Sequence, residues 1–312
     1  MNKHIISIIA LLMLFFSLSF EMSSENYKLS FPLACTINKD CWISAYPDDD
    51  KSDGWHDYKG GTRTYNGHTG TDIAITDIKT MNKGVSVKAA NSGVVLRTRD
   101  GVNDINDKRI GVETVNNFAC GNGIVTDNGS GIKIAYCHMK KGSIKYKKGD
   151  FVKKGDVIGL VGMSGKTEYP HLHIQVFENS KLVDPNAENL WETKIPYNEL
   201  FIYHIGVTDT MPDQLQCKEG GFNQQIISKN SNKIYLWADI FAPMINDKIT
   251  YKIISPDKNM IANNSKIIEK NNVRRFLYMI HKSNLKQGLY TAIVTINRNK
   301  KSYSKLIEFN VK

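Results

Sequence analysis

Beyond its first 20 residues, the sequence has no apolar run long enough to cross a bilayer, which takes about 20 consecutive apolar residues. This absence excludes an internal membrane span. Between about Leu29 and Trp191 the chain also lacks helical periodicity over any long window, which excludes a mainly helical fold there. The motif H-E-x-x-H is missing, so a metalloprotease of that class is excluded. With 41% hydrophobic and 23% charged residues, the composition is globular rather than disordered or fibrous.

The N-terminal segment predicts export. A short basic head (Met1 to His4) precedes the apolar run from Ile5 to Phe20, and the polar stretch "EMSSEN" follows at once. Small residues near the switch, at Ser17 and Ser19, suit cleavage, so we interpret residues 1–20 as a secretory signal peptide. An uncleaved membrane anchor remains the alternative. With cleavage, we expect no stable membrane span and a location in the periplasm or cell envelope, with full secretion also open.

The five cysteines become candidates for disulfide bonds if the chain is exported, because an oxidising compartment preserves such bonds. Cys35 and Cys41 are close enough to close a small loop. Cys120 and Cys137 lie on the two predicted arms of a hairpin, and Cys217 is left over. Since four cysteines allow three pairings, this connectivity is a hypothesis.

The formal net charge is +10, and removal of the signal peptide with Lys3 lowers it by one unit. The lysines are spread through residues 140–156 and the last hundred residues rather than gathered in one stripe with aromatics, so we do not expect nucleic acid as a partner. Anionic envelope polymers fit an exported basic protein better. The lysines could equally do no more than solvate exposed strand faces.

The pattern of strands and turns divides the chain in two. Short β segments with glycine turns, among them Asn128-Gly129, predict a compact antiparallel sheet domain over residues 29–192. Residues 98–118 are polar without alternation and are interpreted as a long loop. Residues 194–312 show regularly spaced alternating strands, which predict a β-sandwich accessory domain. Its histidines, His204 and His281, are interpreted as structural or surface residues.

Candidate metal ligands occur in three separate segments. In "GHTGTDIAI", period-two alternation places His68 and Asp72 on one face, with Gly70 between them leaving open space. In "PHLHIQV", His171 and His173 share one face, and Leu172 takes the other. In "YCHM", His138 is expected to face the pocket while its neighbour Cys137 points away. A catalytic zinc takes three protein ligands and keeps one open position, so these five residues leave two for proton transfer or charge stabilisation.

These segments resemble the lysostaphin-type (LytM-like) zinc endopeptidases, which cut cell-wall peptides. The resemblance spans about residues 66–185, with "GHTGTDIA", "VKAANSGVV", "GNGIVTDNGSG", "YCHM", "VKKGDVIGLVGMSG", "PHLHIQV" and "VDP" in the family's order. It implies that His68, Asp72 and His173 are zinc ligands. It also implies that His138 and His171 are the two unligated catalytic histidines. Asn128 departs from the family, in which many members have a histidine there, but that position is not a ligand.

The resemblance implies a zinc metalloendopeptidase that hydrolyses stem or cross-link peptides of bacterial peptidoglycan. Bound zinc would acidify a water and polarise the peptide carbonyl, and the two unligated histidines would move the proton or stabilise the oxyanion. An inactive relative that binds wall peptides or activates another hydrolase remains the alternative. A further alternative makes the basic C-terminal sandwich the functional part, as a wall-binding module.

Overall fold

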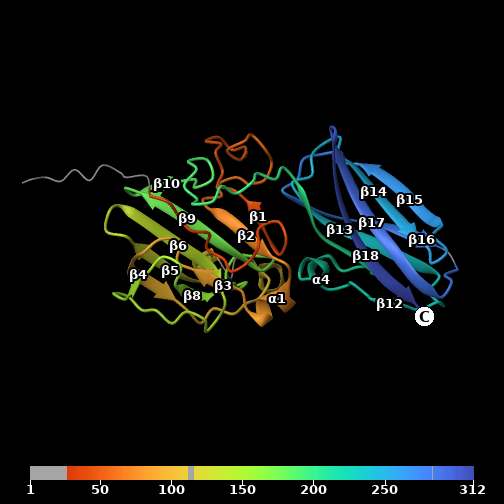
Figure 1. Ribbon diagram of the computed structural model, residues 1–312, viewed down its shortest axis with the longest axis horizontal. Helices are drawn as coiled ribbons and strands as arrows, with labels where there is room; N and C mark the ends of the chain where they lie inside the picture. Colours follow the sequence, from red (N-terminus) through yellow and green to blue (C-terminus); the bar gives the residue numbers. More distant parts are fainter. Residues whose placement is uncertain (1–26, 112–115, 283) are drawn as a thin grey trace, which may run out of the picture.

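The computed structural model describes residues 27–111, 116–282 and 284–312. The predicted signal peptide at residues 1–20 lies outside these ranges. Among the described residues, the helices are all too short or too polar to cross a membrane. Figure 1 shows two β-rich units beside each other, one formed by β1 to β10 and the other by β11 to β18.

An eight-stranded antiparallel sheet forms the first unit, in the order β1-β2-β9-β6-β5-β4-β7 with β10 added on β9. A small two-stranded sheet, β3 with β8, lies next to it, and helix α1 (Ile78–Lys83) follows β2. The strands are β1 (Cys41–Ala45), β2 (Thr71–Ile75), β3 (Ser86–Lys88), β4 (Gly93–Arg99), β5 (Asn122–Asp127), β6 (Ile132–Met139), β7 (Phe151–Val152), β8 (Val157–Leu160), β9 (His171–Glu178) and β10 (Lys181–Val183). The predicted antiparallel sheet is confirmed.

The two faces of the central strands differ, because side chains alternate along a strand. Ile73 and Ile75 on β2 point to one face, together with Leu172, Ile174 and Val176 on β9, and all five are fully buried in the core. The intervening positions, among them Asp72, His171 and His173, therefore point to the other face. One face of the sheet packs into the hydrophobic core, and the other carries polar side chains.

The predicted long loop at residues 98–118 is partly wrong. Strand β4 continues to Arg99, and a short helix α2 (Asp107–Ile110) and a 3₁₀ turn η1 (Asn116–Phe118) lie within the segment. Asn106 caps α2, since its Oδ1 accepts a hydrogen bond from the Lys108 N–H at 3.0 Å. The Asp107 N–H also donates to the Thr167 carbonyl at 3.0 Å, which ties the segment to the edge of the site. Capping polar residues, not alternation, give this segment its structure.

The second unit is the predicted sandwich. A three-stranded sheet (β11-β13-β16) faces a five-stranded sheet (β12-β18-β17-β14-β15), and their inner side chains form one buried cluster. The elements are β11 (Phe201–Thr208), α4 (Gln214–Lys218), β12 (Ile226–Ile227), β13 (Lys233–Phe241), β14 (Lys248–Ile254), β15 (Met260–Ile267), β16 (Arg274–Lys282), β17 (Gly288–Arg298) and β18 (Lys301–Val311). The limits 29–192 and 194–312 stay a prediction.

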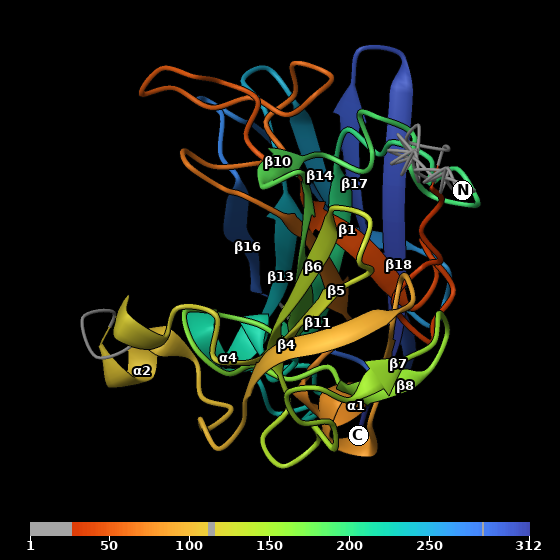
Figure 2. The same ribbon diagram turned by 90° about the vertical axis from the view of Figure 1, so that its left-hand side faces the viewer.

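Strand β11 packs against both units, and all eight of its residues are buried. Ile202 and Ile205 belong to the sandwich core, whereas Phe201 and Tyr203 pack with Ala74 of the first unit. The Tyr203 hydroxyl donates to the Ile75 carbonyl. At the other side of this interface, Figure 2 shows α2 and α4 next to each other. There the Arg109 guanidinium makes two 2.9 Å hydrogen bonds to the Glu219 carboxylate just after α4.

Candidate metal centre and active site

His68 lies just before β2 rather than on it, because the strand begins at Thr71. The prediction that strand alternation orients His68 is therefore wrong. A turn with Gly67 at φ 72° leads into His68, and backbone hydrogen bonds hold it there: its carbonyl accepts from the Asp48 N–H at 2.7 Å. Its imidazole Nδ1 lies 2.7 Å from the Tyr46 carbonyl. One neighbouring segment thus holds both the backbone of His68, through Asp48, and its ring, through Tyr46.

Asp72 and His173 are direct partners across the β2–β9 pair. Residues opposite each other in an antiparallel pair point to the same face, which brings Asp72 Oδ1 to 2.7 Å from His173 Nδ1. Gly70 makes room for this imidazole: a Cβ at that position would lie 2.6 Å from His173 Nε2. The space left by Gly70 is therefore filled by His173.

These three residues form a cluster that could hold a metal ion, with the ligand atoms all within 4.8 Å of one another. His68 Nε2 lies 3.2 Å from Asp72 Oδ1 and 3.2 Å from His173 Nδ1. Ligands at about 2.0 to 2.1 Å from a tetrahedral zinc are roughly 3.3 Å apart. The two His68 distances fit this spacing, whereas Asp72 Oδ1 and His173 Nδ1, at 2.7 Å, are at hydrogen-bond distance and would move apart slightly on binding zinc. Since His68 Nδ1 faces a carbonyl, it carries the proton and leaves Nε2 free to bind a metal.

A second group, formed by Cys35, Asp40 and Cys41, has the spacing of metal ligands but not the chemistry. Its two cysteines are joined in the predicted disulfide and so offer no thiolate.

His171 lies two residues before His173 on β9, on the same face, as predicted. Its Nδ1 is 2.9 Å from the Tyr169 carbonyl and 3.0 Å from the Thr167 hydroxyl. With Nδ1 donating to the carbonyl, Nε2 is unprotonated and lies 3.6 Å from Asp72 Oδ1. The Tyr169 ring stacks on the imidazole at 4.7 Å between centroids, so the ring orientation of His171 is set from two sides.

His138 reaches the same face by a different route from the predicted one. Cys137 pairs directly with His173 in the β6–β9 register, so Cys137 does not point away from the site. The pairing of β6 with β5 shifts at this point, and His138 has a positive φ of 60°, which turns its side chain to the same face. Its ring centroid lies 4.6 Å from that of His171 and 5.8 Å from that of His173.

The predicted disulfide between Cys120 and Cys137 is present, with the Cα atoms 4.9 Å apart. Both cysteines line a cavity of about 290 Å³ whose walls also include His138 and His173. The disulfide therefore borders the site instead of lying behind it. The Cys120 carbonyl accepts a hydrogen bond from the His138 N–H at 2.8 Å, which stabilises the bulge. Cys217, the remaining cysteine, is free and buried.

Asp72 is charged in this site, whereas His138 and His171 are neutral. Burial alone would raise the pKa of Asp72, but the neighbouring His68 and His171 hold it well below its ordinary value, so the group is ionised. Burial lowers the pKa of His138 well below its usual range, and the nearby His171 and His173 add to this effect. Burial likewise lowers the pKa of His171. Both imidazoles are therefore neutral at pH 7 and can accept a proton.

His138 has the same tautomer as His171. Its Nδ1 lies 2.8 Å from the Ser164 carbonyl and must carry the proton, which leaves Nε2 as the acceptor. The Ser164 hydroxyl in turn donates to the Met139 carbonyl at 2.7 Å. Sequence reasoning missed Ser164, Thr167 and Tyr169, which hold the histidines through backbone carbonyls and ring contacts. No motif marks a carbonyl acceptor, because every residue has one.

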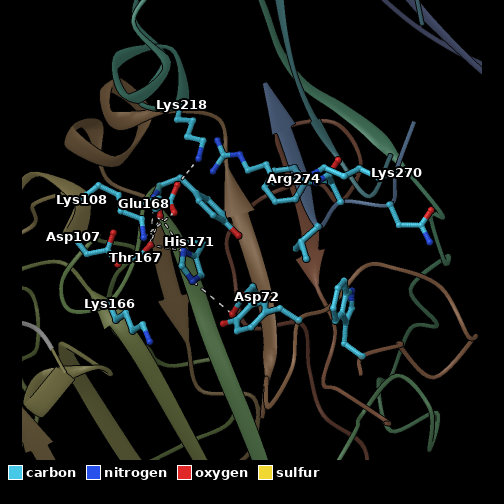
Figure 3. Close-up of a pocket in the computed structure, with 17 residues that line it drawn as sticks. Asp72, Asp107, Lys108, Lys166, Thr167, Glu168, His171, Lys218, Lys270 and Arg274 are labelled. Atoms are coloured by element: carbon cyan, nitrogen blue, oxygen red, sulfur yellow. Dashed lines mark hydrogen bonds and ion pairs between the residues drawn. The ribbon is translucent and has the colours of Figure 1, made fainter. Parts of the chain in front are cut away.

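The site opens on both sides. The cavity of about 290 Å³ lies toward the disulfide, and a larger one of about 770 Å³ extends from Asp72 and His171 toward the sandwich. Tyr65 and Lys166 line both cavities. The Tyr65 ring stacks on His68 with centroids 4.4 Å apart, although the residue is half exposed. Figure 3 shows the larger cavity, with His171 and Asp72 at its base.

Comparison with known proteins places the site within one family. Residues 66–185 match the profile of Peptidase family M23. Peptidoglycan DD-endopeptidase ShyA of Vibrio cholerae is 30% identical over 134 residues, which is 43% of this chain and 26% of that protein. Lysostaphin of Staphylococcus simulans is 33% identical over 110 residues, 34% of this chain and 19% of that protein. The structure of Helicobacter pylori Csd3 aligns with a TM-score of 0.34 and 23% identity, over 54% of this chain and 35% of that one.

The chain spans only about a quarter or less of the length of these curated relatives. The matched segment nevertheless contains His68, Asp72, His138, His171 and His173. The predicted resemblance is confirmed: residues 66–185 match the profile of Peptidase family M23, and lysostaphin is among the relatives.

Proposed function

We propose that the protein is a zinc-dependent endopeptidase that hydrolyses peptide bonds in bacterial peptidoglycan. The observation that carries this proposal is the joint arrangement of two groups. His68, Asp72 and His173 present three ligand atoms within 4.8 Å of one another, the donor set of two imidazoles and one carboxylate that suits zinc. His138 and His171, both neutral, stand beside them with one free nitrogen each.

The three ligands would be His68 through Nε2, Asp72 through Oδ1 and His173 through Nδ1. Zinc held by three protein ligands supplies a Lewis acid with an open position, which polarises a carbonyl and lowers the pKa of water. The Tyr46 carbonyl has the orienting role toward His68 that outer hydrogen-bond partners have in metal sites. The buried, ionised Asp72 supplies the negative charge that a divalent cation needs.

His138 and His171 would carry the proton transfers. Each can accept a proton at Nε2 while its Nδ1–H stays bound to a backbone carbonyl. Once protonated, each donates a hydrogen bond from Nε2, and a donor aimed at the developing oxyanion stabilises the transition state. Because the two rings are 4.6 Å apart, the ring that accepts the proton could then donate it toward the oxyanion, while the other stays neutral as a second proton acceptor.

The open cleft favours cleavage within a peptide over removal of a terminal residue. An exopeptidase needs one end of its groove closed, whereas here the cavities extend to both sides of the ligand cluster. Two relatives are named peptidoglycan DD-endopeptidase and lysostaphin, which supports peptidoglycan as the substrate.

We propose the periplasm or cell envelope as the location, since the two disulfides suit an oxidising compartment. The basic surface would favour anionic envelope polymers as secondary partners.

The test is digestion of purified peptidoglycan, with mass spectrometry of the released fragments. We expect new peptide termini with wild-type protein, loss of cleavage after zinc removal by a chelator, and recovery on adding zinc back. A chain that binds peptidoglycan and releases no fragment in the zinc-loaded form would instead be the inactive, wall-binding relative.

A further inference from the structure

The larger cavity beside the site has walls from both units of the chain. Asp72 and His171 lie at its base, and the sandwich contributes Lys270, Val273 and Arg274 on the far side. Figure 3 shows Lys108 and Lys166 on one side of His171 and Lys270 on the opposite side. A peptide that passes from the ligand cluster into this cavity would therefore touch the sandwich.

The segment that forms the far wall, residues 270–273, is fixed to the neighbouring loop. The Asn272 N–H donates to the Pro243 carbonyl at 3.0 Å, and the Val273 carbonyl accepts from the Ala242 N–H at 2.8 Å. The Asn271 side chain accepts from the Ile245 N–H at 2.9 Å. With its backbone held at two points and the Asn271 side chain at a third, this segment presents the exposed Lys270 from a rigid support.

The wall is also fixed relative to the histidines. Arg274, directly after the segment, is buried and paired with the fully buried Asp239. Its guanidinium lies 4.4 Å from the ring centroid of Tyr169, the residue that stacks on His171. The Tyr169 ring thus contacts both Arg274 of the sandwich and His171 of the first unit. This packing fixes the distance between the segment that carries Lys270 and the site.

Two lysines of this cavity have no ion pair among the described residues, although Lys166 interacts electrostatically with the Asp107 carboxylate. Glu168 is engaged by Lys218 through a hydrogen bond and by Lys108 at 3.7 Å. Within the described residues, the side chains of Lys166 and Lys270 form neither an ion pair nor a hydrogen bond. Unpaired lysines on opposite walls of a cleft favour a negatively charged ligand.

One buried acceptor is also unsatisfied. Asp107 lines the same cavity and is 3% exposed, yet its Oδ1 atom has no hydrogen-bond partner among the described residues. A buried polar atom without a hydrogen-bond partner is destabilising, and this penalty is removed when a ligand donates to the atom. The cavity therefore offers cationic donors for a carboxylate and one acceptor for an N–H group.

We propose that this cavity is a substrate subsite shared by the two units, which binds a peptide carrying a free carboxylate, with Lys270 of the sandwich and Lys166 as its cationic partners and Asp107 as an N–H acceptor. The proposal rests on the peptidase function. It assigns the sandwich a direct part in choosing the substrate, in addition to any role in wall attachment.

The test uses the full chain and synthetic peptides with the sequences of peptidoglycan stem and cross-link peptides, chosen without reference to cleavage. Each carboxylate is replaced in turn by a carboxamide. For the peptide whose carboxylate occupies the subsite, we expect Lys270→Glu to lower kcat/KM about tenfold, the effect of about 1.4 kcal/mol. On the matching carboxamide peptide, Lys270→Glu and wild type should be equal. Lys229→Glu, an exposed charge reversal outside the cavity, is the matched control and should leave both values unchanged.

A binding measurement separates this proposal from the peptidase function. His138→Ala protein, expected to turn over little, is titrated with the same peptides with and without Lys270→Glu, so affinity is read without turnover. If wild type cleaves nothing but Lys270→Glu still weakens only the carboxylate peptide, the peptidase function fails and the subsite stands. Equal losses on both peptides, or no loss on any peptide, would overturn the subsite.

Discussion

His173 Nδ1 and Asp72 Oδ1 lie 2.7 Å apart although 101 positions separate the two residues in the sequence. They are direct partners on β2 and β9, so the contact follows from strand register rather than from a flexible loop. A preformed pair of this kind needs little reorganisation to bind a metal. We therefore expect the purified protein to hold about one zinc per chain.

His173→Ala should remove most of this zinc, because it deletes one of three ligands and opens the space beside Gly70. Elemental analysis of the purified variant measures the loss. Full zinc content in His173→Ala would show that the residue is not a ligand.

His138→Ala should keep its zinc, because His138 is not one of the three clustered ligands and its ring centroid lies 5.8 Å from that of His173. Its turnover should fall by about a hundredfold or more, the range for acid–base and oxyanion groups. Metal content and peptide cleavage are measured on the same preparation. Unchanged cleavage would make His138 a structural histidine.

Gly70→Ala should disturb the site without removing any functional group. The added Cβ would lie 2.6 Å from His173 Nε2 and 2.7 Å from the Ile174 carbonyl, so the imidazole has to move away from Asp72. We expect zinc affinity to fall by about tenfold or more, as for changes to groups that orient metal ligands. Thr69→Ala, at the exposed neighbouring position, is the control and should bind zinc as wild type does.

Loss of the Cys120–Cys137 disulfide should destabilise the first unit by roughly 2 to 4 kcal/mol, by freeing the unfolded chain. The double variant Cys120→Ser, Cys137→Ser should also lose activity, because the disulfide holds the bulge that orients His138. The matched double variant at Cys35 and Cys41 should be less stable but keep its turnover. A peptide map of unreduced wild-type protein checks the pairing itself.

Acid should weaken the fold through His204. Burial lowers the pKa of this group to about 4, whereas an unfolded histidine titrates near 6.5. The unfolded chain therefore binds the extra proton first, and stability is lost as the pH falls from about 6.5 to 4. This group accounts for roughly 3 kcal/mol of that loss. His204→Gln keeps a donor for the Thr76 carbonyl and should flatten the decline in urea unfolding between pH 7 and 4.5. An identical decline would contradict the assignment.

Much of the correct prediction of side-chain direction came from the period-two alternation along strands. It placed Leu172 in the core and His171 and His173 together on the other face, because both belong to a regular strand. It failed at His68, which a turn orients, and at Cys137 and His138, where a bulge resets the alternation. A bulge depends on the partner strand and on the Cys120 carbonyl, which lies 18 positions away from His138, so no local pattern reports it.

The contribution of the sandwich to the site was equally hidden. Strand β11 is buried on both faces and shows no alternation, and β15 is a mostly exposed strand at the edge of its sheet. Neither strand therefore has the alternating pattern that predicts a strand. The contact between Arg274 and Tyr169 depends on how two sheets pack, which single-sequence patterns do not contain.

The separation between β2 and β9 has a consequence for the order of events in folding. Pairings between distant segments form late, since the intervening chain must first be closed into a loop. The metal cluster needs that pairing, because Asp72 and His173 come from its two strands. Newly synthesised chains would then remain free of zinc until the centre of the sheet has assembled. Metal uptake would report a completed fold, and hydrolytic activity could not arise in a half-folded chain.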